Sequence, residues 1–98
     1  MNPLYSKFEH MFPYRCCQKY RIDSEFTIVT NYSNKMLYLN ETAGNIFLLC
    51  NGKRTVQEIC SQLMSEYEIS QDVIQDDLIK IIRDLQWNKI IKLSQTIK

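Results

Sequence analysis

The chain has 98 residues, of which 45% are hydrophobic and 23% are charged, and its formal net charge is +1. This length fits one domain with a single core, and the near-neutral charge argues against a strongly basic nucleic-acid surface. The longest apolar run, 46–50, is far shorter than the roughly 20 residues that cross a bilayer, and no signal pattern opens the chain. We therefore expect a cytoplasmic protein that uses no membrane.

The four cysteines and the one histidine offer no familiar metal site. Cys16 and Cys17 are adjacent, whereas zinc sites use spaced pairs. Cys50 and Cys60 fall on the apolar faces of predicted helices, where a thiol serves as a small hydrophobic group. His10 has no evident catalytic partner. A thiol redox role would depend on Cys16 and Cys17 alone. From the spacing of the cysteines and the single histidine, we expect no metal and no cofactor.

Extended segments dominate the first forty residues. Residues 1–13 are weakly patterned and are expected to form an N-terminal arm, either a short helix or a tail docked on the core. Tyr14–Gln18 is predicted to be a first strand, and the polar stretch Lys19–Glu25 a turn. Phe26–Thr30 and Met36–Leu39 have the composition and alternation of strands. Three strands with short links predict an antiparallel meander with at least one unpaired edge.

Three amphipathic helices are predicted after the strands. Asn40 has the residue type of an N-cap, and Thr55 with Glu58 has the spacing of a capping box. Gly52 can adopt the left-handed conformation that follows a helix, and Ser70 is a third N-cap candidate. The helices are expected over Glu41–Asn51, over Val56–Tyr67 and from Ser70 to about Trp87 or Asn88.

The third helix carries two rows of side chains that are wholly or partly apolar. The first, expected to face the core, consists of Ile74, Leu78, Ile81 and Leu85. The second consists of Gln75, Ile79, Ile82 and Gln86. One core face needs only the first row. We therefore expect the second row to border the sheet or a groove, with ordinary core packing as the alternative for Ile79 and Ile82.

This order of elements predicts an α+β fold, with a three-stranded antiparallel sheet followed by three helices. The domain is expected over residues 14–93, with a short extended segment near its end, and residues 94–98 are expected to fray. The sequence contains no glycine-rich phosphate loop and no nucleophile elbow. Asp76 and Asp77 point about 100° apart on one helix, which suits no paired acid and base. We therefore expect a binding module and not an enzyme.

The junction between strands and helices resembles the PqqD family, whose members are also called RiPP recognition elements. The resemblance lies in Leu39–Ala43 (L-N-E-T-A), the apolar helix that follows, and Asn51–Val56 with Glu58 and Ile59. Leu63, Tyr67 and Asp77–Leu78 extend it through the long last helix. It covers roughly residues 26–93, and the first 25 residues carry no match. The family fold is similar to a winged helix-turn-helix.

The resemblance implies that the chain binds the leader of a ribosomally made precursor peptide. In this family the leader adds as a strand to the third strand, and its side chains enter a groove beside the third helix. The edge would be Lys35, Met36, Leu37, Tyr38 and Leu39. The wall of the groove would be Ile79, Ile82 and Gln86, with Asp76 and Arg83 at its margins. An exposed strand edge binds extended peptides through unpaired backbone groups, which suits this role.

The resemblance also implies a separate modifying enzyme as partner, such as a radical SAM enzyme, a lasso-peptide protease or a cyclase. The chain would present the leader to it in a ternary complex, as a monomer or as a dimer paired through the third strand. One alternative is winged-helix DNA binding, although Asp72, Asp76, Asp77 and Asp84 outnumber Lys80 and Arg83 on the exposed helix and would repel phosphates. Another is a small structural subunit of a complex that binds no leader.

Overall fold

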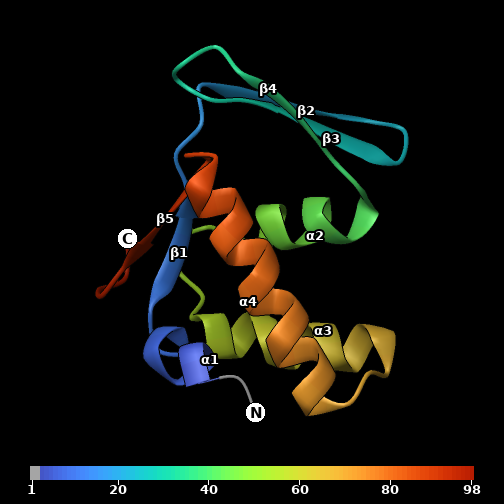
Figure 1. Cartoon of the computed structure of the whole chain (residues 1–98), viewed down its shortest axis with the longest axis vertical. Coiled ribbons are helices and arrows are strands. Elements are labelled where there is room, and N and C mark those ends of the chain that lie inside the picture. Colours follow the sequence, from blue (N-terminus) through green and yellow to red (C-terminus); the bar gives the residue numbers. More distant parts are fainter. Residues whose placement is uncertain (1–2) are drawn as a thin grey trace.

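The computed structural model describes residues 3–98, which form two small sheets and four helices (Figure 1). Strand β1 (Phe12–Arg15) pairs antiparallel with β5 (Ile91–Ser94). The larger sheet is antiparallel in the order β2 (Lys19–Asp23), β3 (Phe26–Thr30), β4 (Met36–Leu39). The helices are α1 (Pro3–Phe8), α2 (Glu41–Leu49), α3 (Val56–Tyr67) and α4 (Gln71–Trp87). None of the helices in this described part is long and apolar enough to cross a membrane.

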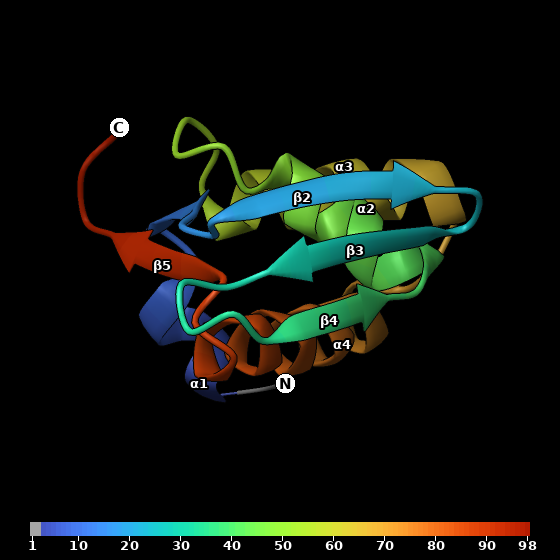
Figure 2. The same ribbon diagram turned by 90° about the horizontal axis from the view of Figure 1, so that it is seen from above.

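The three-stranded sheet forms one layer of the molecule and the helices form the other. Figure 1 shows the sheet above α2, with α3 and most of α4 farther away. Seen from above, β4 runs along the side where α4 lies, and β2 forms the opposite edge (Figure 2). The predicted fold class, a three-stranded antiparallel sheet followed by three helices, is therefore confirmed.

The first strand of this sheet is Lys19–Asp23, so the turn predicted over Lys19–Glu25 is confined to Ser24 and Glu25. The strand predicted over Tyr14–Gln18 as the first of the meander was wrong, because only Tyr14 and Arg15 are extended and they belong to β1 of the smaller sheet. All five residues of β2 are exposed, and its charged residues alternate with Tyr20 and Ile22. This polar composition resembles a turn because β2 is an edge strand whose outer face meets solvent. The segment before it, Phe12–Arg15, pairs with β5 in the smaller sheet.

Both ends of the described part of the chain, residues 3–98, are attached to the rest of the domain. The N-terminal arm contains α1, which packs against α4, and Tyr5 of α1 is buried. At the other end, the Lys98 N–H donates to the Gly52 carbonyl at 2.8 Å, and the Lys53 ammonium donates to the Lys98 carbonyl at 3.1 Å. The end of the segment expected to fray is thus held by the turn around Gly52.

Local capping signals explain where the helices begin. The Asn40 side chain accepts from the Ala43 N–H at 2.9 Å, and Thr55 with Glu58 forms both bonds of a capping box. Ser70 occupies the N-cap position of α4, but its side chain makes no capping hydrogen bond, unlike the prediction. Gly52 has a φ of +79°, the left-handed conformation expected for it, although α2 already ends at Leu49.

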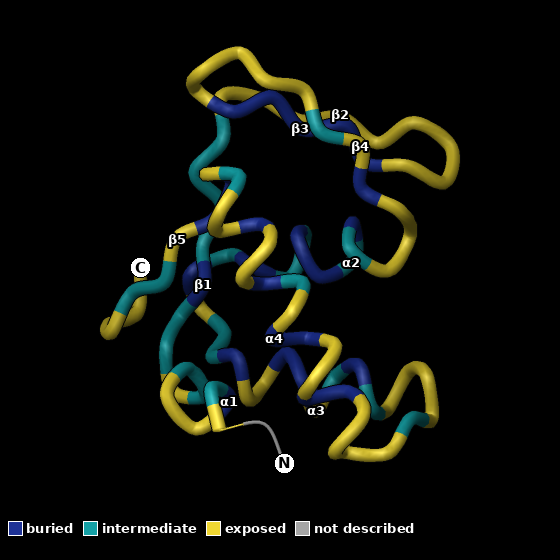
Figure 3. Tube along the Cα trace, in the orientation of Figure 1, coloured by how far each residue is buried: buried dark blue, intermediate teal, exposed yellow. Residues whose placement is uncertain are grey.

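The core lies between the sheet and the helices and continues to α1 and the smaller sheet (Figure 3). Phe47 of α2 and Val29 of β3 are fully buried at its centre. Helix α2 approaches β3 closely at Gly44, where an added Cβ would lie 2.5 Å from the Thr27 hydroxyl oxygen. This close approach sets the position of the helix that follows β4, and thereby the geometry around the β4 edge.

Candidate functional site

The β4 edge is open on the side of the sheet where α4 lies (Figure 2). The Lys35 carbonyl accepts from the Asn31 N–H at 3.0 Å, so Lys35 directs its backbone toward β3. Because successive residues of a strand point their backbone groups to opposite sides, Met36 and Tyr38 direct theirs to the open edge. Within residues 3–98 no further strand pairs with them. The edge therefore offers unpaired donors and acceptors to an incoming extended chain.

The side chains of β4 divide between the two faces of the sheet. Met36 and Tyr38 lie on the outer face and are 52% and 67% exposed. Leu37 is half-buried and Leu39 is buried, both on the inner face toward the helices. An added strand would follow the same alternation, so that every second side chain would point toward the helical layer.

One end of the space between β4 and α4 is closed by hydrogen bonds. The Asn31 amide donates to the Asn88 carbonyl at 3.0 Å, and the Lys35 ammonium donates to the Asn88 side-chain oxygen at 3.4 Å. Trp87 lies beside these residues and is 84% exposed. This end thus joins the β3–β4 turn to the C-terminal end of α4 and leaves an indole on the surface.

The other end opens into an apolar cavity of about 470 Å³ below the end of β4. Asn40, Thr42 and Ala43 line it where β4 gives way to α2. Buried side chains from α2, α3 and α4 line its apolar part, namely Ile46, Leu63, Ile74, Leu78 and Leu85. The half-buried Ile81 and the charged residues Asp77, Lys80 and Asp84 also line it from α4. A cavity of this size accommodates one or two large apolar side chains.

The face of α4 that lines this cavity is not the one that the sequence predicted. Ile79 and Ile82, proposed as the groove wall, are 2% and 0% exposed and belong to the core cluster. Ile81, assigned by the sequence to the core stripe, is half-buried and lines the cavity. Helix α1 and strand β5 pack against α4, and three residues of the second row, Gln75, Ile79 and Ile82, are buried, whereas Gln86 is exposed.

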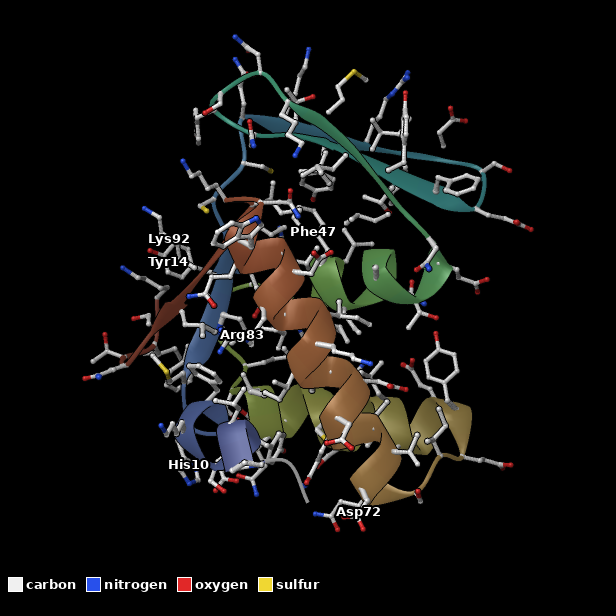
Figure 4. All side chains as sticks on the ribbon, in the orientation of Figure 1. His10, Tyr14, Phe47, Asp72, Arg83 and Lys92 are labelled. Carbon is white, nitrogen blue, oxygen red and sulfur yellow. The ribbon has the colours of Figure 1, made fainter. Side chains whose placement is uncertain are left out.

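The polar residues predicted at the groove margins are also placed apart from this cavity. Asp76 is exposed and does not line it. Arg83 and Gln86 line a separate depression with Phe8 of α1 and Trp87, and Figure 4 shows Arg83 on the side of α4 where β1 and β5 lie, away from α2. The cavity begins at Asn40, directly after β4, and its lining includes neither the predicted β4 residues nor Arg83 and Gln86.

The thiols are poorly suited to act as nucleophiles. Burial raises the pKa of Cys50 to about 12 and also raises the pKa of Cys16, Cys17 and Cys60 above its ordinary value. A thiol with a raised pKa carries little thiolate at neutral pH, and the thiolate is the reactive form. Across residues 3–98 no three histidine, cysteine or acidic side chains gather as a metal site. The arrangement around β4 is suited to binding.

The sequence matches a known protein family. Residues 17–91 match the family described as coenzyme PQQ synthesis protein D (PqqD). The chain belongs to the PqqD family. A curated relative, the "PqqA binding protein" of Bradyrhizobium diazoefficiens, is 33% identical over 51 residues, which are 52% of this chain and 50% of the relative. The match thus spans about half the length of that relative, and no solved structure matches the chain.

The PqqD match can be placed on the structure. Residues 17–91 run from just before β2 to the first residue of β5, so they include the β4 edge and every residue that lines the cavity. They leave out α1, which packs against α4, and β1, which pairs with β5. The elements that pack against α4 therefore lie partly outside the family region, where the sequence offered no resemblance.

Proposed function

We propose that this PqqD-family chain binds the leader segment of a ribosomally made precursor peptide and presents it to a separate modifying enzyme. The observation that carries the proposal is the open β4 edge next to an apolar cavity of about 470 Å³. Backbone groups at the edge hold an extended peptide with little regard to its sequence, and a pocket beside the edge supplies selectivity. The name of the relative, a PqqA binding protein, supports a peptide ligand.

In this proposal the leader adds as a fourth strand along Lys35–Leu39. Its inward side chains follow Leu37 and Leu39 toward the helices, and at least one apolar side chain enters the cavity beside Ile81. Burial of one such side chain contributes about 1.5–3 kcal/mol, while each backbone hydrogen bond adds about 0.5–1.5 kcal/mol. Asp77, Lys80 and Asp84 line the same cavity and would select the charge of the neighbouring leader residues.

The partner enzyme in the proposal is a radical SAM enzyme, a lasso-peptide protease or a cyclase, as the family resemblance implies. The chain itself would perform no chemistry. Its candidate site consists of a strand edge and an apolar cavity, and the pKa values of its thiols are raised. Its contribution would be to fix the leader so that the rest of the precursor reaches the active site of that enzyme.

The test is binding of a fluorescently labelled synthetic leader from a precursor encoded beside this gene, measured by fluorescence polarisation. We expect a dissociation constant between sub-micromolar and micromolar values, and no binding of a scrambled leader. Amide chemical shifts in NMR spectra should change at Met36–Leu39 and around Ile81. If no leader of any neighbouring precursor binds, the proposal is wrong.

A further inference from the structure

The second edge of the three-stranded sheet, strand β2, is also open. All five of its residues are exposed, and in the described part of the chain no strand lies beyond it. Figure 2 shows β2 at the edge opposite to β4 and α4. Natural proteins commonly protect such an edge with a proline, with charged side chains or with a covering segment. Strand β2 has no proline, and its apolar residues Tyr20 and Ile22 are 42% and 63% exposed.

Contacts with α2 and Arg15 fix the position of β2. The Tyr20 ring packs edge-on against Phe47, with the ring centroids 5.3 Å apart and an interplanar angle of 82°. The Arg15 guanidinium lies 5.7 Å from the centre of the Tyr20 ring and donates to the Leu48 carbonyl at 2.7 Å. These contacts tie β2 to the C-terminal end of α2, so the edge is already in the conformation that strand pairing needs.

The charges along this edge change sign at Ile22. Lys19 and Arg21 precede it, and Asp23 and Glu25 follow it. None of these four side chains forms an ion pair with another side chain of residues 3–98. Because β2 alternates, Lys19, Arg21 and Asp23 share the outer face of the sheet, and Glu25 lies in the turn that follows. The edge is therefore positive along its first half and negative along its second.

This pattern is complementary to itself in an antiparallel arrangement. With Ile22 on a twofold axis, Arg21 lies opposite Asp23 of the second copy, and Lys19 has no opposite residue because the chain turns after Asp23. An axis at Arg21 would place Arg21 against its own copy, and an axis at Tyr20 would place Lys19 against Arg21. Like charges directly opposite each other destabilise strand pairs, whereas opposite charges stabilise them. Of these three registers, only the one centred on Ile22 avoids a like-charge pair.

We propose that two copies of this chain associate through their β2 edges, antiparallel, with Ile22 on the twofold axis. Each copy contributes three strands, so the dimer would contain one continuous sheet of six, with both β4 edges free at its ends. The pairing covers a short strand, much less than a standard protein interface, so the dimer is weak and forms as the concentration rises. This inference stands on β2 alone and does not depend on the proposed leader binding.

Sedimentation equilibrium of the full chain over a wide concentration range tests the dimer. The wild-type chain should shift from monomer to dimer as its concentration increases. Arg21→Asp and Asp23→Arg each create two like-charge pairs across the axis, so each variant should raise the dissociation constant by roughly tenfold or more. Both positions are exposed, and circular dichroism should show that both variants keep the wild-type fold.

An equimolar mixture of the two variants tests the register. In a mixed dimer the new carboxylate opposes the new guanidinium, and Asp23 of the first variant opposes Arg21 of the second. The mixture should therefore regain wild-type dimerisation that neither variant shows alone. A wild-type chain that stays monomeric at every concentration would overturn the proposal, and β2 would then be open to a different protein. Variants that dimerise like the wild type, or a mixture that stays monomeric, would overturn the register and the proposal with it.

Discussion

The two edges of the three-stranded sheet are open in different ways. Strand β4 lies on the side of α4, next to a cavity lined with apolar side chains, and two of its four residues direct their side chains inward. Strand β2 borders a depression of about 400 Å³ whose lining combines Ile22 and Phe26 with polar residues, namely Ser24, Glu25, Thr27, Glu41 and Asn45, and the charges of β2 change sign at its centre. The backbone chemistry of the two edges is the same, so the side chains around each edge decide what it can bind.

This difference separates two kinds of recognition. An edge with an apolar cavity can distinguish ligands by the side chains that fit into it, which suits a foreign peptide. An edge with self-complementary charges distinguishes partners by the strand register and by the sign of the charges that lie opposite each other, which suits a second copy of the same strand. Variants that affect one edge and spare the other provide the clearest tests of this comparison.

The largest effect is expected from Ile82→Glu, which should abolish both functions. Ile82 is fully buried in the core cluster, and the new carboxylate would have no partner there. The free energy of unfolding should fall by about 3–5 kcal/mol, the cost of an uncompensated buried charge. Chemical denaturation followed by circular dichroism measures this loss. If the Ile82→Glu variant instead folds and binds the leader poorly, Ile82 belongs to the wall of the binding groove, as the sequence predicted, and not to the core.

The adjacent change, Ile81→Glu, is the matched control and should affect the β4 edge alone. Ile81 is half-buried on the wall of the cavity, so a carboxylate there can reach solvent and the fold should survive. Leader affinity should fall roughly 10- to 100-fold, as for loss of a central apolar contact in an interface. Fluorescence polarisation measures the affinity, and sedimentation should show unchanged dimerisation. Unchanged leader affinity would exclude this cavity as the binding pocket.

A smaller effect is expected from Tyr38→Pro, which removes one outward N–H from the β4 edge. The loss of one hydrogen bond to an added strand should weaken leader binding by up to about tenfold. Tyr38→Ala keeps the N–H and removes only the side chain, so it serves as the control. Polarisation titrations of both variants separate the two contributions. Equal losses in both variants would show that the ligand contacts the Tyr38 ring instead of the strand edge.

The smallest effect is expected from salt. Raising the ionic strength screens exposed charge pairs, so the β2 dimer should weaken a few-fold between low and high salt. The apolar contribution to leader binding in the cavity should change less over the same range. Sedimentation and polarisation on the same samples measure the two dependences. A dimer that tightens with salt would indicate pairing driven by Ile22 and Tyr20 instead of by charge.

Much of the site could be predicted from the sequence because its signals are local. Asn40 and the pair Thr55–Glu58 cap helices through bonds that span only three residues. Strand β4 is marked by its alternation, and the same stretch carries the family resemblance. The α4 side of the site could not be predicted in the same way. The sequence shows two rows on this helix, and only the segments packed against it decide which row reaches solvent.

By itself, then, the sequence determined the order of helices and strands from β3 to α4, the caps that begin α2 and α3, and membership of the PqqD family. Only the tertiary structure decided that Lys19–Asp23 is a strand, because its pairing with β3 outweighs a polar composition that is typical of turns. It also decided that Ile82 is buried and Ile81 lines the cavity, because α1 and β5 pack against α4. Burial depends on what packs against a surface, and the segments that pack here lie far apart in the sequence.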